Sequence, residues 1–331
     1  MDSKKAFAIQ FSWIFILIVA FMIMLFVITS ITKQTDISET EIDIEVLQNI
    51  ESILGSSEQS TNTFKVVTTP EMNFEYICED NYSAYSVNKI QKKIQNLILF
   101  SPKQTVGRKF FTWAKEYSMP MKITNILYLT NQKHKYIFIK SNIIDQLISE
   151  LPSNLTMEVL TSFSEIVDEN YDSYTIITTD GIPSSELNLP DSIIKKTMVL
   201  QINTGIANYN KGNISFYDGN GDVVGNSPYI DTTLLYGAIF NADYEMYECN
   251  LNKILKKSET VYAIYNYVAL KQNESESKSV CINNHYPRAI ASLGGMIESV
   301  PSQDFNTIYL ASISLQLANE RLQRDGCSIV Y

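Results

Sequence analysis

The sequence predicts a protein of mixed class, α+β / α/β, with four parts: an N-terminal transmembrane helix, a small β-rich region, an α/β layer with a short parallel sheet, and a C-terminal antiparallel helix pair. Three observations predict this arrangement. Residues 11–31 form an uncharged apolar run. Runs of strand length, rich in aromatic and β-branched residues, follow up to residue 205 and enclose one helical pattern. Two long helical patterns then close the chain of 331 residues.

The apolar run at residues 11–31 decides the predicted topology. It reads FSWIFILIVAFMIMLFVITSI, and its 21 residues include no charge. As a helix it would be about 31 Å long, which matches a bilayer hydrocarbon core of about 30 Å. A cleavable signal peptide is the alternative, but its apolar region is normally about 7–15 residues long and ends at a small-x-small site. We therefore predict an uncleaved anchor that holds the chain in the lipid bilayer.

Charges on the two sides of this run predict its orientation. Lys4 and Lys5 precede it, whereas acidic residues dominate residues 36–45. Because basic flanks stay in the cytoplasm, residues 1–10 are expected there and the bulk of the chain outside the cell membrane. The chain carries 26 Lys+Arg against 36 Asp+Glu, a net charge of −10. This balance excludes the basic surfaces that bind nucleic acid, so the expected partners are the bilayer and other surface proteins.

All four cysteines lie in the predicted extracytoplasmic part: Cys78, Cys249, Cys281 and Cys327. An even number of cysteines in such a region indicates two disulfide bonds, for which three pairings are possible. Free buried thiols are the alternative. No pair has CxxC spacing, so a zinc site is not expected, and the sequence indicates no cofactor.

Residues 32–63 are predicted to form a stalk helix and a polar linker. Apolar residues recur at helical spacing between residues 36 and 54, and Gly55 is expected to end the helix. The apolar stripe of this helix has two possible partners: the protein's own domain, which we favour, and a neighbouring copy. The run SSEQSTNT at 56–63 is the clearest domain boundary in the chain.

Residues 64–133 are predicted to be a β-rich region of short strands and turns. Aromatic and β-branched residues dominate five runs, at 64–67, 74–78, 82–87, 96–100 and 123–130. The segment at 90–95, IQKKIQ, also fits a helix.

Residues 134–232 are predicted to be an α/β layer with a hairpin. Apolar runs of strand length occur at 136–139, 155–161, 174–179 and 197–202, and a helical pattern at 143–151 separates the first two. This alternation predicts a βαβ unit with a parallel sheet.

The hairpin is predicted at 212–225, around the turn Asp218-Gly219-Asn220-Gly221-Asp222. Asp218, Asn220 and Asp222 also have the spacing of a calcium loop. However, Val223 stands where that loop needs Gly, and Tyr229 stands where it needs a bidentate Glu. A plain turn is therefore expected.

Residues 233–331 are predicted to be a C-terminal helical region with two helices. The first pattern runs from residue 243 to 270 and the second from 304 to 324, with Gly326 as the stop. Two helices joined by one loop would pack antiparallel, which would bring Cys249, early in the first helix, close to Cys327, just after the second. We therefore favour a Cys249–Cys327 bond, which leaves Cys281 for Cys78 by elimination.

Five strings carry a resemblance to a known family. They are KKAFAIQFSWIFILIVAF near the start, LILFSPK at 97–103, GRKFFTWAKEYSMPMKITNILYLTN at 107–131, LLYGAIFNADYEMYECNLN at 234–252 and RDGCSIVY at the end. Together they resemble a family of single-pass membrane-anchored surface proteins of small-genome archaea of the DPANN type. The resemblance implies an archaeal cell surface and nothing about catalysis.

The sequence carries few candidates for a chemical site. Its two histidines, His134 and His285, lie in the polar strings QKHKY and NNHYPR and are expected to be solvated loop residues. No GxSxG, HExxH or P-loop string occurs, so an enzyme is not expected. Weak ligand-binding candidates follow two predicted parallel strands, where open α/β sheets place ligands. They are Thr178, Thr179, Asp180 and Asn203; the alternative, which we favour, is that TDGIP is simply a turn.

The predicted function is a non-enzymatic, membrane-anchored protein for surface contact, scaffolding or envelope organisation. One alternative is a ligand-binding or hydrolytic domain near Asp180, which a second carboxylate such as Glu165 or Asp168 would support. Another is a pilin-like subunit, since Gln10-Phe11-Ser12 resembles the start of a pilin-type signal. Four sequons could carry glycan on an outer surface, at Asn81, Asn154, Asn213 and Asn273.

Overall fold

A computed structural model gives the fold. It describes residues 16–30, 44, 46–48, 50–56, 61–79, 82–88, 90–94, 97–168, 170–181, 187, 189–205, 208–241 and 243–331. The chain divides into two compact units, Met1–Glu51 and Ser52–Tyr331, which are described separately below.

The first unit contains the predicted N-terminal helix. Residues 16–30 are helical, which confirms a helix within the apolar run, while residues 11–15 and 31 lie outside the described residues. Among the residues that the structure describes, no helix combines the length and the apolar character needed to cross a membrane. Residues 44, 46–48 and 50–56 are also helical, in the predicted stalk and at the first residue of the linker. The rest of the stalk and residues 57–60 of the polar linker lie outside the described residues.

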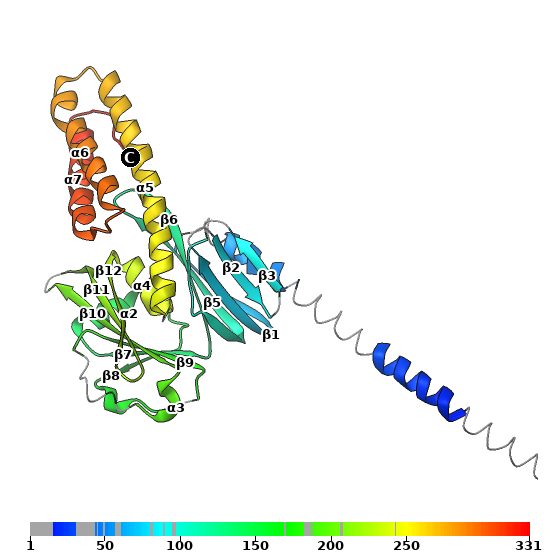
Figure 1. The fold of residues 1–331 in the computed structure, drawn as a ribbon. Coiled ribbons are helices and arrows are strands. Elements are labelled where there is room, and N and C mark those ends of the chain that lie inside the picture. The colour runs from blue at the N-terminus through cyan, green and yellow to red at the C-terminus, as the bar shows by residue number, and fades with distance from the viewer. Residues whose placement is uncertain are drawn as a thin grey trace, which may run out of the picture. The chain divides into compact units, whose positions relative to one another are not determined.

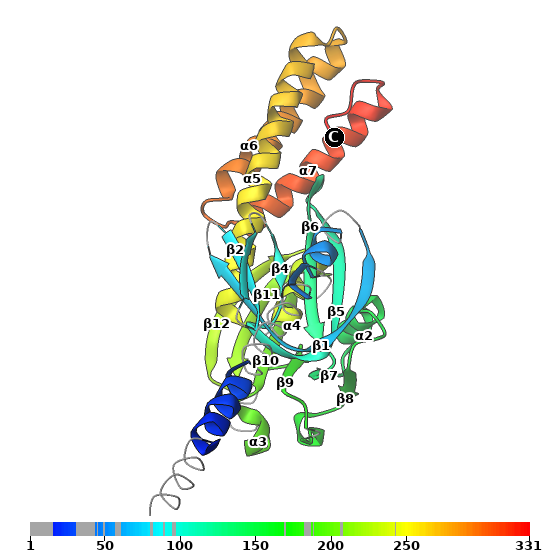
Figure 2. The same cartoon turned by 90° about the vertical axis from the view of Figure 1, so that its right-hand side faces the viewer.

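The second unit is of mixed α+β class and contains two six-stranded sheets (Figures 1 and 2). The first sheet has the strand order β3-β2-β1-β5-β6-β4. Neighbouring strands in it pair in antiparallel fashion, except β4 and β6, which are parallel. Its strands are β1 (Thr63–Glu79), β2 (Tyr82–Val87), β3 (Ile90–Ile94), β4 (Leu99–Phe100), β5 (Gln104–Ser118) and β6 (Lys122–Asn131).

The first sheet differs from the predicted set of short strands in three ways. The runs at 64–67 and 74–78 are two parts of one 17-residue strand, β1, whose register shifts between Thr68 and Met72 around Pro70. Proline normally interrupts a strand, but a bulge accommodates it. The 15-residue strand β5 was not predicted, because charged residues interrupt its apolar alternation. The helical alternative for residues 90–95 is wrong, since Ile90–Ile94 is strand β3.

The second sheet has the strand order β12-β11-β10-β9-β7-β8. Strands β8, β7, β9 and β10 are parallel, which confirms the predicted short parallel sheet, and the β11–β12 hairpin extends it in antiparallel fashion. Helix α2 (Asn142–Glu150) connects β7 to β8, and the short helix α3 (Asp191–Ile194) lies between β9 and β10. The strands are β7 (His134–Ile139), β8 (Met157–Leu160), β9 (Ser173–Thr178), β10 (Thr197–Gly205), β11 (Asn208–Asp218) and β12 (Val223–Ile230).

Four α-helices follow the second sheet: α4 (Thr232–Asn241), α5 (Tyr244–Ser275), α6 (Tyr286–Ser299) and α7 (Phe305–Arg324). Helices α5 and α7 confirm the two predicted patterns, and the side chains of Asp243 and Asp304 cap their first turns. Helix α6, which packs against both α5 and α7, was not predicted. Its sequence contains Pro287, Gly294 and Gly295, which indicate a loop, although proline is tolerated in the first helical turn.

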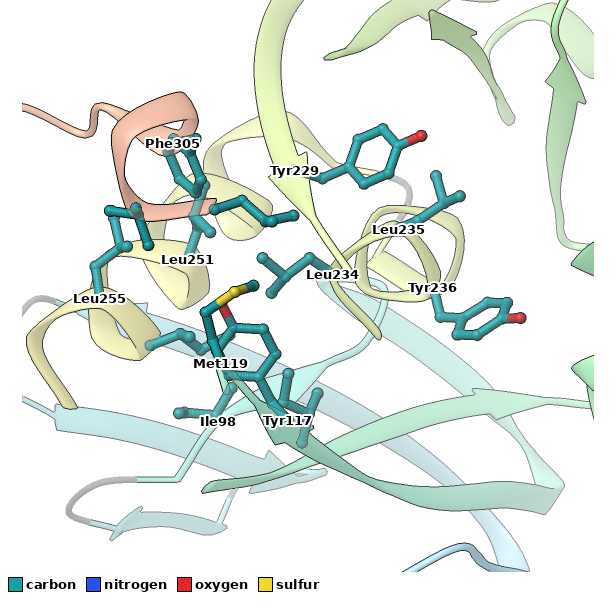
Figure 3. Packing of buried hydrophobic residues seen from close by; sticks show 14 of the residues in the cluster. Ile98, Tyr117, Met119, Tyr229, Leu234, Leu235, Tyr236, Leu251, Leu255 and Phe305 are labelled. Carbon is teal, nitrogen blue, oxygen red and sulfur yellow. The ribbon is translucent and has the colours of Figure 1, made fainter. Parts of the chain in front are cut away.

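Helix α4 is the centre of the core. All ten of its residues are buried, and it contacts strands of both sheets. Figure 3 shows its Leu234, Leu235 and Tyr236 among side chains from the first sheet, from β12 and from helices α5 and α7. A helix that is apolar on every side has no amphipathic period, and this is why the sequence pattern did not reveal it.

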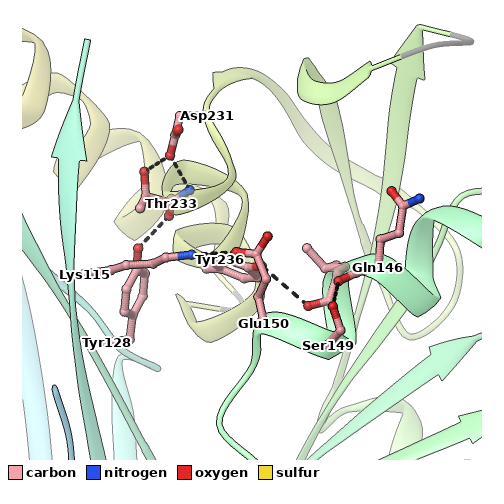
Figure 4. Close-up of polar contacts among 9 residues, drawn as sticks. Lys115, Tyr128, Gln146, Ser149, Glu150, Asp231, Thr233 and Tyr236 are labelled. Atoms are coloured by element: carbon pink, nitrogen blue, oxygen red, sulfur yellow. Dashed lines mark hydrogen bonds and ion pairs between the residues drawn. The ribbon is translucent and has the colours of Figure 1, made fainter. Parts of the chain in front are cut away.

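Polar contacts connect α4 and α2 to the first sheet (Figure 4). Lys115 on β5 forms an ion pair with Glu150 on α2, with 2.7 Å between Nζ and Oε2. The same ammonium lies 4.7 Å from the centre of the Tyr236 ring on α4. On β6, Tyr128 donates its hydroxyl proton to the carbonyl of Thr233 at 2.8 Å. The first sheet is therefore joined to α2 and to the buried helix α4 by specific polar contacts as well as by apolar packing.

Candidate functional site

The weak ligand-binding candidates lie at the carboxyl end of β9, in a favourable topological position. The chain leaves β7 toward β8 and leaves β9 toward β10, so its two crossovers diverge between the neighbours β7 and β9. Such a switch point is where open α/β sheets bind ligands. Here Thr179 donates a hydrogen bond to Ser141, with 3.0 Å between the hydroxyl oxygens, and Ser141 also caps helix α2.

The local geometry at this edge is that of a turn. Thr178 is fully buried, and its hydroxyl oxygen accepts a hydrogen bond from the backbone N–H of Asp180 at 3.1 Å. The Asp180 side chain is exposed. A threonine that bonds the backbone two residues ahead is a common way to begin a turn, and this supports the turn interpretation of TDGIP.

Among the described residues, the carboxylates of Glu165 and Asp168 are each held by partners other than Asp180. Glu165 accepts hydrogen bonds from both the backbone N–H and the hydroxyl of Thr161, after β8. Asp168 accepts bonds from the Asn170 N–H and the Tyr174 hydroxyl, near the opposite end of β9. The bonds from Thr161 lower the pKa of Glu165, and a side-chain hydrogen bond from Ser192, followed by those from Asn170 and Tyr174, lowers the pKa of Asp168. Both carboxyl groups are therefore ionised at neutral pH, and neither is poised as a general acid.

Asn203, the fourth candidate, is separate from this turn. Its amide donates to the Ser215 hydroxyl at 3.1 Å, and it lines a hollow of about 510 Å³ beside the first turn of α7. Asn213, Tyr229, Gln303 and Asn306 also line this hollow. The carboxylate of Asp304 already accepts the backbone N–H of Thr307, so the helix terminus in this hollow is capped by the chain itself.

The sequons lie in different environments. Asn154 and Asn213 are exposed, whereas Asn273 is half-buried on α5, with its Oδ1 atom enclosed. Asn81 lies outside the described residues. Asn154 and Asn213 are therefore the sequons in the described part of the chain that glycan could most easily reach.

The expectation of solvated histidines is wrong for both residues. His134 is the first residue of β7 and is 2% exposed, and His285 ends a single π-helical turn, Cys281–His285, and is 6% exposed. The Nδ1 atom of His134 lies 2.6 Å from the Ser173 hydroxyl, and its Nε2 atom lies 2.8 Å from that of Thr175. Two hydroxyl partners satisfy both nitrogens of a neutral imidazole, and this is how the strand buries a polar ring.

Burial lowers the pKa of His134 to about 3. An imidazole with this pKa is too weak a base to activate the nearby Ser173 at neutral pH, although the two side chains are hydrogen-bonded. We therefore assign the Ser173–His134–Thr175 contacts a structural role.

This low pKa predicts a pH-dependent stability. Above pH 6.5, His134 is neutral in both folded and unfolded chains; below it, the unfolded chain takes up a proton that the folded chain accepts only near pH 3. The contribution of His134 to the free energy of unfolding should fall by about 2 kcal/mol between pH 7 and pH 5. Urea unfolding at both pH values should show a smaller loss for His134→Gln than for the wild type. Equal losses for the two proteins would contradict the assignment.

Two disulfide bonds are present, but the predicted pairing of Cys249 with Cys327 and of Cys78 with Cys281 is wrong. Cys78 is bonded to Cys249, and Cys281 is bonded to Cys327. The unexpected helix α6 is the physical reason, because it reverses the chain once more between α5 and α7. Helix α7 therefore ends beside the carboxyl end of α5, next to Cys281, while Cys249 remains at the other end of this 32-residue helix.

The C-terminal tail, residues 325–331, holds the ends of α5 and α7 together. Besides the Cys281–Cys327 bond, His285 contacts Asp325 with 2.7 Å between Nε2 and Oδ2, and this hydrogen bond lowers the pKa of Asp325. Gln272 on α5 donates to the carbonyl of Ile329 at 3.0 Å, and Asn319 on α7 donates to that of Tyr331 at 3.0 Å. The tail thereby fixes the spacing of the two helices.

Exposed apolar side chains lie on both α5 and α7. On α5, Ile264, Tyr267 and Leu270 form what we call the α5 outer face. On α7, Leu310, Ile313 and Leu317 form what we call the α7 outer stripe. Single exposed apolar residues are ordinary, but three in succession on one side of a helix indicate an interaction surface.

No family model, curated protein or solved structure matches this chain. The resemblance to archaeal surface proteins therefore stays a prediction.

Proposed function

We propose that this chain is a membrane-anchored, extracytoplasmic and non-enzymatic protein whose C-terminal helices bind other proteins at the cell surface. The observation that carries this proposal is the pair of apolar surfaces, the α5 outer face and the α7 outer stripe. Tyr267 is 62% exposed and Leu310 is 56% exposed, although each helix also has a separate buried apolar side. Helices with a second apolar side are typical of groove-and-helix recognition between proteins.

Other features support the location. The uncharged run at 11–31 is long enough to anchor the chain, and both disulfides belong to the part of the chain proposed to lie outside. Disulfide bonds form and persist in oxidising compartments and are rare in a reducing cytosol. The resemblance to archaeal surface proteins points to an archaeal cell surface as this compartment.

The proposal is tested by co-purification of the full-length chain from its native membrane in mild detergent, followed by mass spectrometry. We expect stoichiometric protein partners with the wild type, and their loss with the double variants Ile264→Glu/Tyr267→Glu or Leu310→Glu/Leu317→Glu. The matched control is Val223→Glu, which also replaces an exposed apolar residue but lies on β12. Partners that survive both double variants, or that are lost equally with the control, would contradict the proposal.

The alternative function is ligand binding at the carboxyl edge of the parallel strands, and the position of Thr179 and Asp180 at the switch point favours it. The same purification distinguishes the two. A chain that carries a small molecule and no protein, and loses it on Asp180→Ala, would replace our proposal with this one.

A further inference from the structure

Helix α7 has two apolar sides, and only one is used within the chain. Ile308, Leu315 and Leu322 recur every seven residues and are buried. The α7 outer stripe (Leu310, Ile313 and Leu317) lies on the opposite side and is 40–56% exposed. Its spacing of three and then four residues is that of the contact seam in a coiled coil.

The outer stripe lies within a helical segment free of charge. From Phe305 to Asn319 the sequence is FNTIYLASISLQLAN, with no acidic or basic residue. The whole chain has a net charge of −10, so two copies repel one another over most orientations. Charge depletion around an apolar centre is the composition found in the core of protein interfaces, and it removes this repulsion locally.

We propose that the α7 outer stripe binds the same stripe on a second copy of this chain, as an antiparallel pair of α7 helices about a two-fold axis. This inference rests on the proposed function and names the partner of one of its surfaces. Leu310 and Leu317 lie equally far from the midpoint between Ile313 and Ser314. In an antiparallel pair centred there, each Leu310 packs on Leu317 of the other copy, and the two Ile313 side chains meet at the axis.

Charges beside the stripe are complementary in this register. Position 320 of one helix lies opposite position 307 of the other, because both pairs of numbers sum to 627, as 310 and 317 do. Glu320 is exposed and lies three turns from Tyr309, on the same flank of α7. Lys211 lies beside position 307, since its Nζ atom is 3.5 Å from Asn306 Oδ1 and 4.5 Å from the centre of the Tyr309 ring.

The two-fold axis therefore brings each Glu320 toward Lys211 of the other copy. The dimer would contain two such contacts, related by the axis. A parallel pair would instead place the two Glu320 carboxylates opposite each other. Antiparallel packing also sets the two helix dipoles in opposite directions, and it places Arg324 opposite Gln303 of the other copy, next to Asp304. Charge and dipole thus favour the same register as the leucine spacing.

Cysteine cross-linking of the full-length chain in mild detergent tests this register. All four native cysteines are in disulfide bonds, so one introduced cysteine is the single free thiol per chain. With a short bismaleimide, Ile313→Cys should form a covalent dimer with itself. Leu310→Cys and Leu317→Cys should react poorly alone and should form a dimer with one copy of each when mixed. The control Gln323→Cys, exposed on α7 near its end and far from the two-fold axis, should stay monomeric.

Self-cross-linking of Leu310→Cys as efficient as that of the mixture, or no cross-linking above the Gln323→Cys control, would overturn the proposal. A charge exchange provides the second test. Glu320→Lys and Lys211→Glu should each raise the Kd of the pair about tenfold or more, and the double variant Glu320→Lys/Lys211→Glu should restore it. Failure of restoration, with unchanged melting temperature, would also overturn the register.

These outcomes separate the inference from the proposed function. A chain that is monomeric in all these assays, yet loses its co-purified proteins with Ile264→Glu/Tyr267→Glu, would refute the self-association and keep the contact function. A cross-linked dimer that co-purifies with nothing else would support self-association as the contact itself. A monomer that binds nothing would refute both.

Discussion

Removal of the Cys78–Cys249 bond is expected to lower the free energy of unfolding by about 5 kcal/mol. The bond closes a loop with a sequence separation of 171 residues, and the loss of chain entropy in the unfolded state grows with the logarithm of this length. The double variant Cys78→Ala/Cys249→Ala keeps the neighbouring buried contacts, among them the Tyr76 hydroxyl bonded to Asn250 Oδ1 at 3.1 Å. The measurement is urea unfolding of the full chain in mild detergent, followed by far-UV circular dichroism.

The second disulfide provides a matched control. Cys281→Ala/Cys327→Ala opens a loop with a separation of 46 residues, for which the same reasoning gives about 4 kcal/mol. The structural change caused by removing the Cys281–Cys327 bond should be confined to the C-terminal helices, since this bond joins the π-helical turn to the C-terminal tail. Fluorescence of Trp113 in the core, recorded with Trp13→Phe in both variants, should therefore change less with the second variant than with the first. A larger core effect for the Cys281–Cys327 bond would contradict this account.

The second large effect is expected for Trp113→Ala, which should cost about 3–5 kcal/mol of folding stability. Trp113 lies on β5 and is 6% exposed, with its ring centre 5.0 Å from that of Tyr128 and 5.2 Å from that of Tyr236. Truncation leaves a cavity between the first sheet and α4, and it removes an aromatic face near the Lys115 ammonium, 5.4 Å from the ring centre.

The informative control is Trp113→Phe, which keeps an aromatic ring at the same position. We expect it to lose less than half as much stability as Trp113→Ala, because it leaves a smaller cavity. Thermal and urea unfolding of both variants give the comparison. Equal losses would contradict the assignment of this stability to ring packing.

The sequence predicted elements that have a local signal. Helices α5 and α7 have apolar residues at helical spacing, the strands of the βαβ unit are apolar runs between polar segments, and the hairpin has turn residues at Asp218, and the structure confirms all of them. Elements without a period were missed. Helix α4 is apolar on every side, β5 is interrupted by charges, and α6 carries Gly294 and Gly295 within its length.

One missed helix also changed the disulfide pairing. With two helices, Cys249 and Cys327 would be neighbours, but with three they lie at opposite ends of α5. The burial of His134 could not be predicted from the sequence either, because it depends on the hydroxyl groups of Ser173 and Thr175 on the neighbouring strand. A sequence shows which residues are polar, but the order of strands decides which of them become partners.

The candidate surfaces were partly visible in the sequence. Leu310, Ile313 and Leu317 all belong to the apolar pattern that predicted α7. The pattern does not reveal that one apolar side of this helix is buried and the other exposed, since that depends on α6 covering only one of them. The position of Asp180 at a strand end followed from the sequence, whereas its distance from Glu165 and Asp168 required the fold.

The Cys78–Cys249 bond has a mechanical consequence. The proposed anchor leads into β1, and β1 is joined covalently through Cys78 to α5, which carries the outer face at its far end. Tension between the membrane and a partner held by the C-terminal helices would run along β1, across the sulfur atoms and into α5. The 170 residues between the two cysteines, counted from the sequence separation of 171, lie outside this covalent path. Strand β1 would carry the load within the first sheet, whereas the second sheet, whose strands all lie between the two cysteines, would be shielded from it.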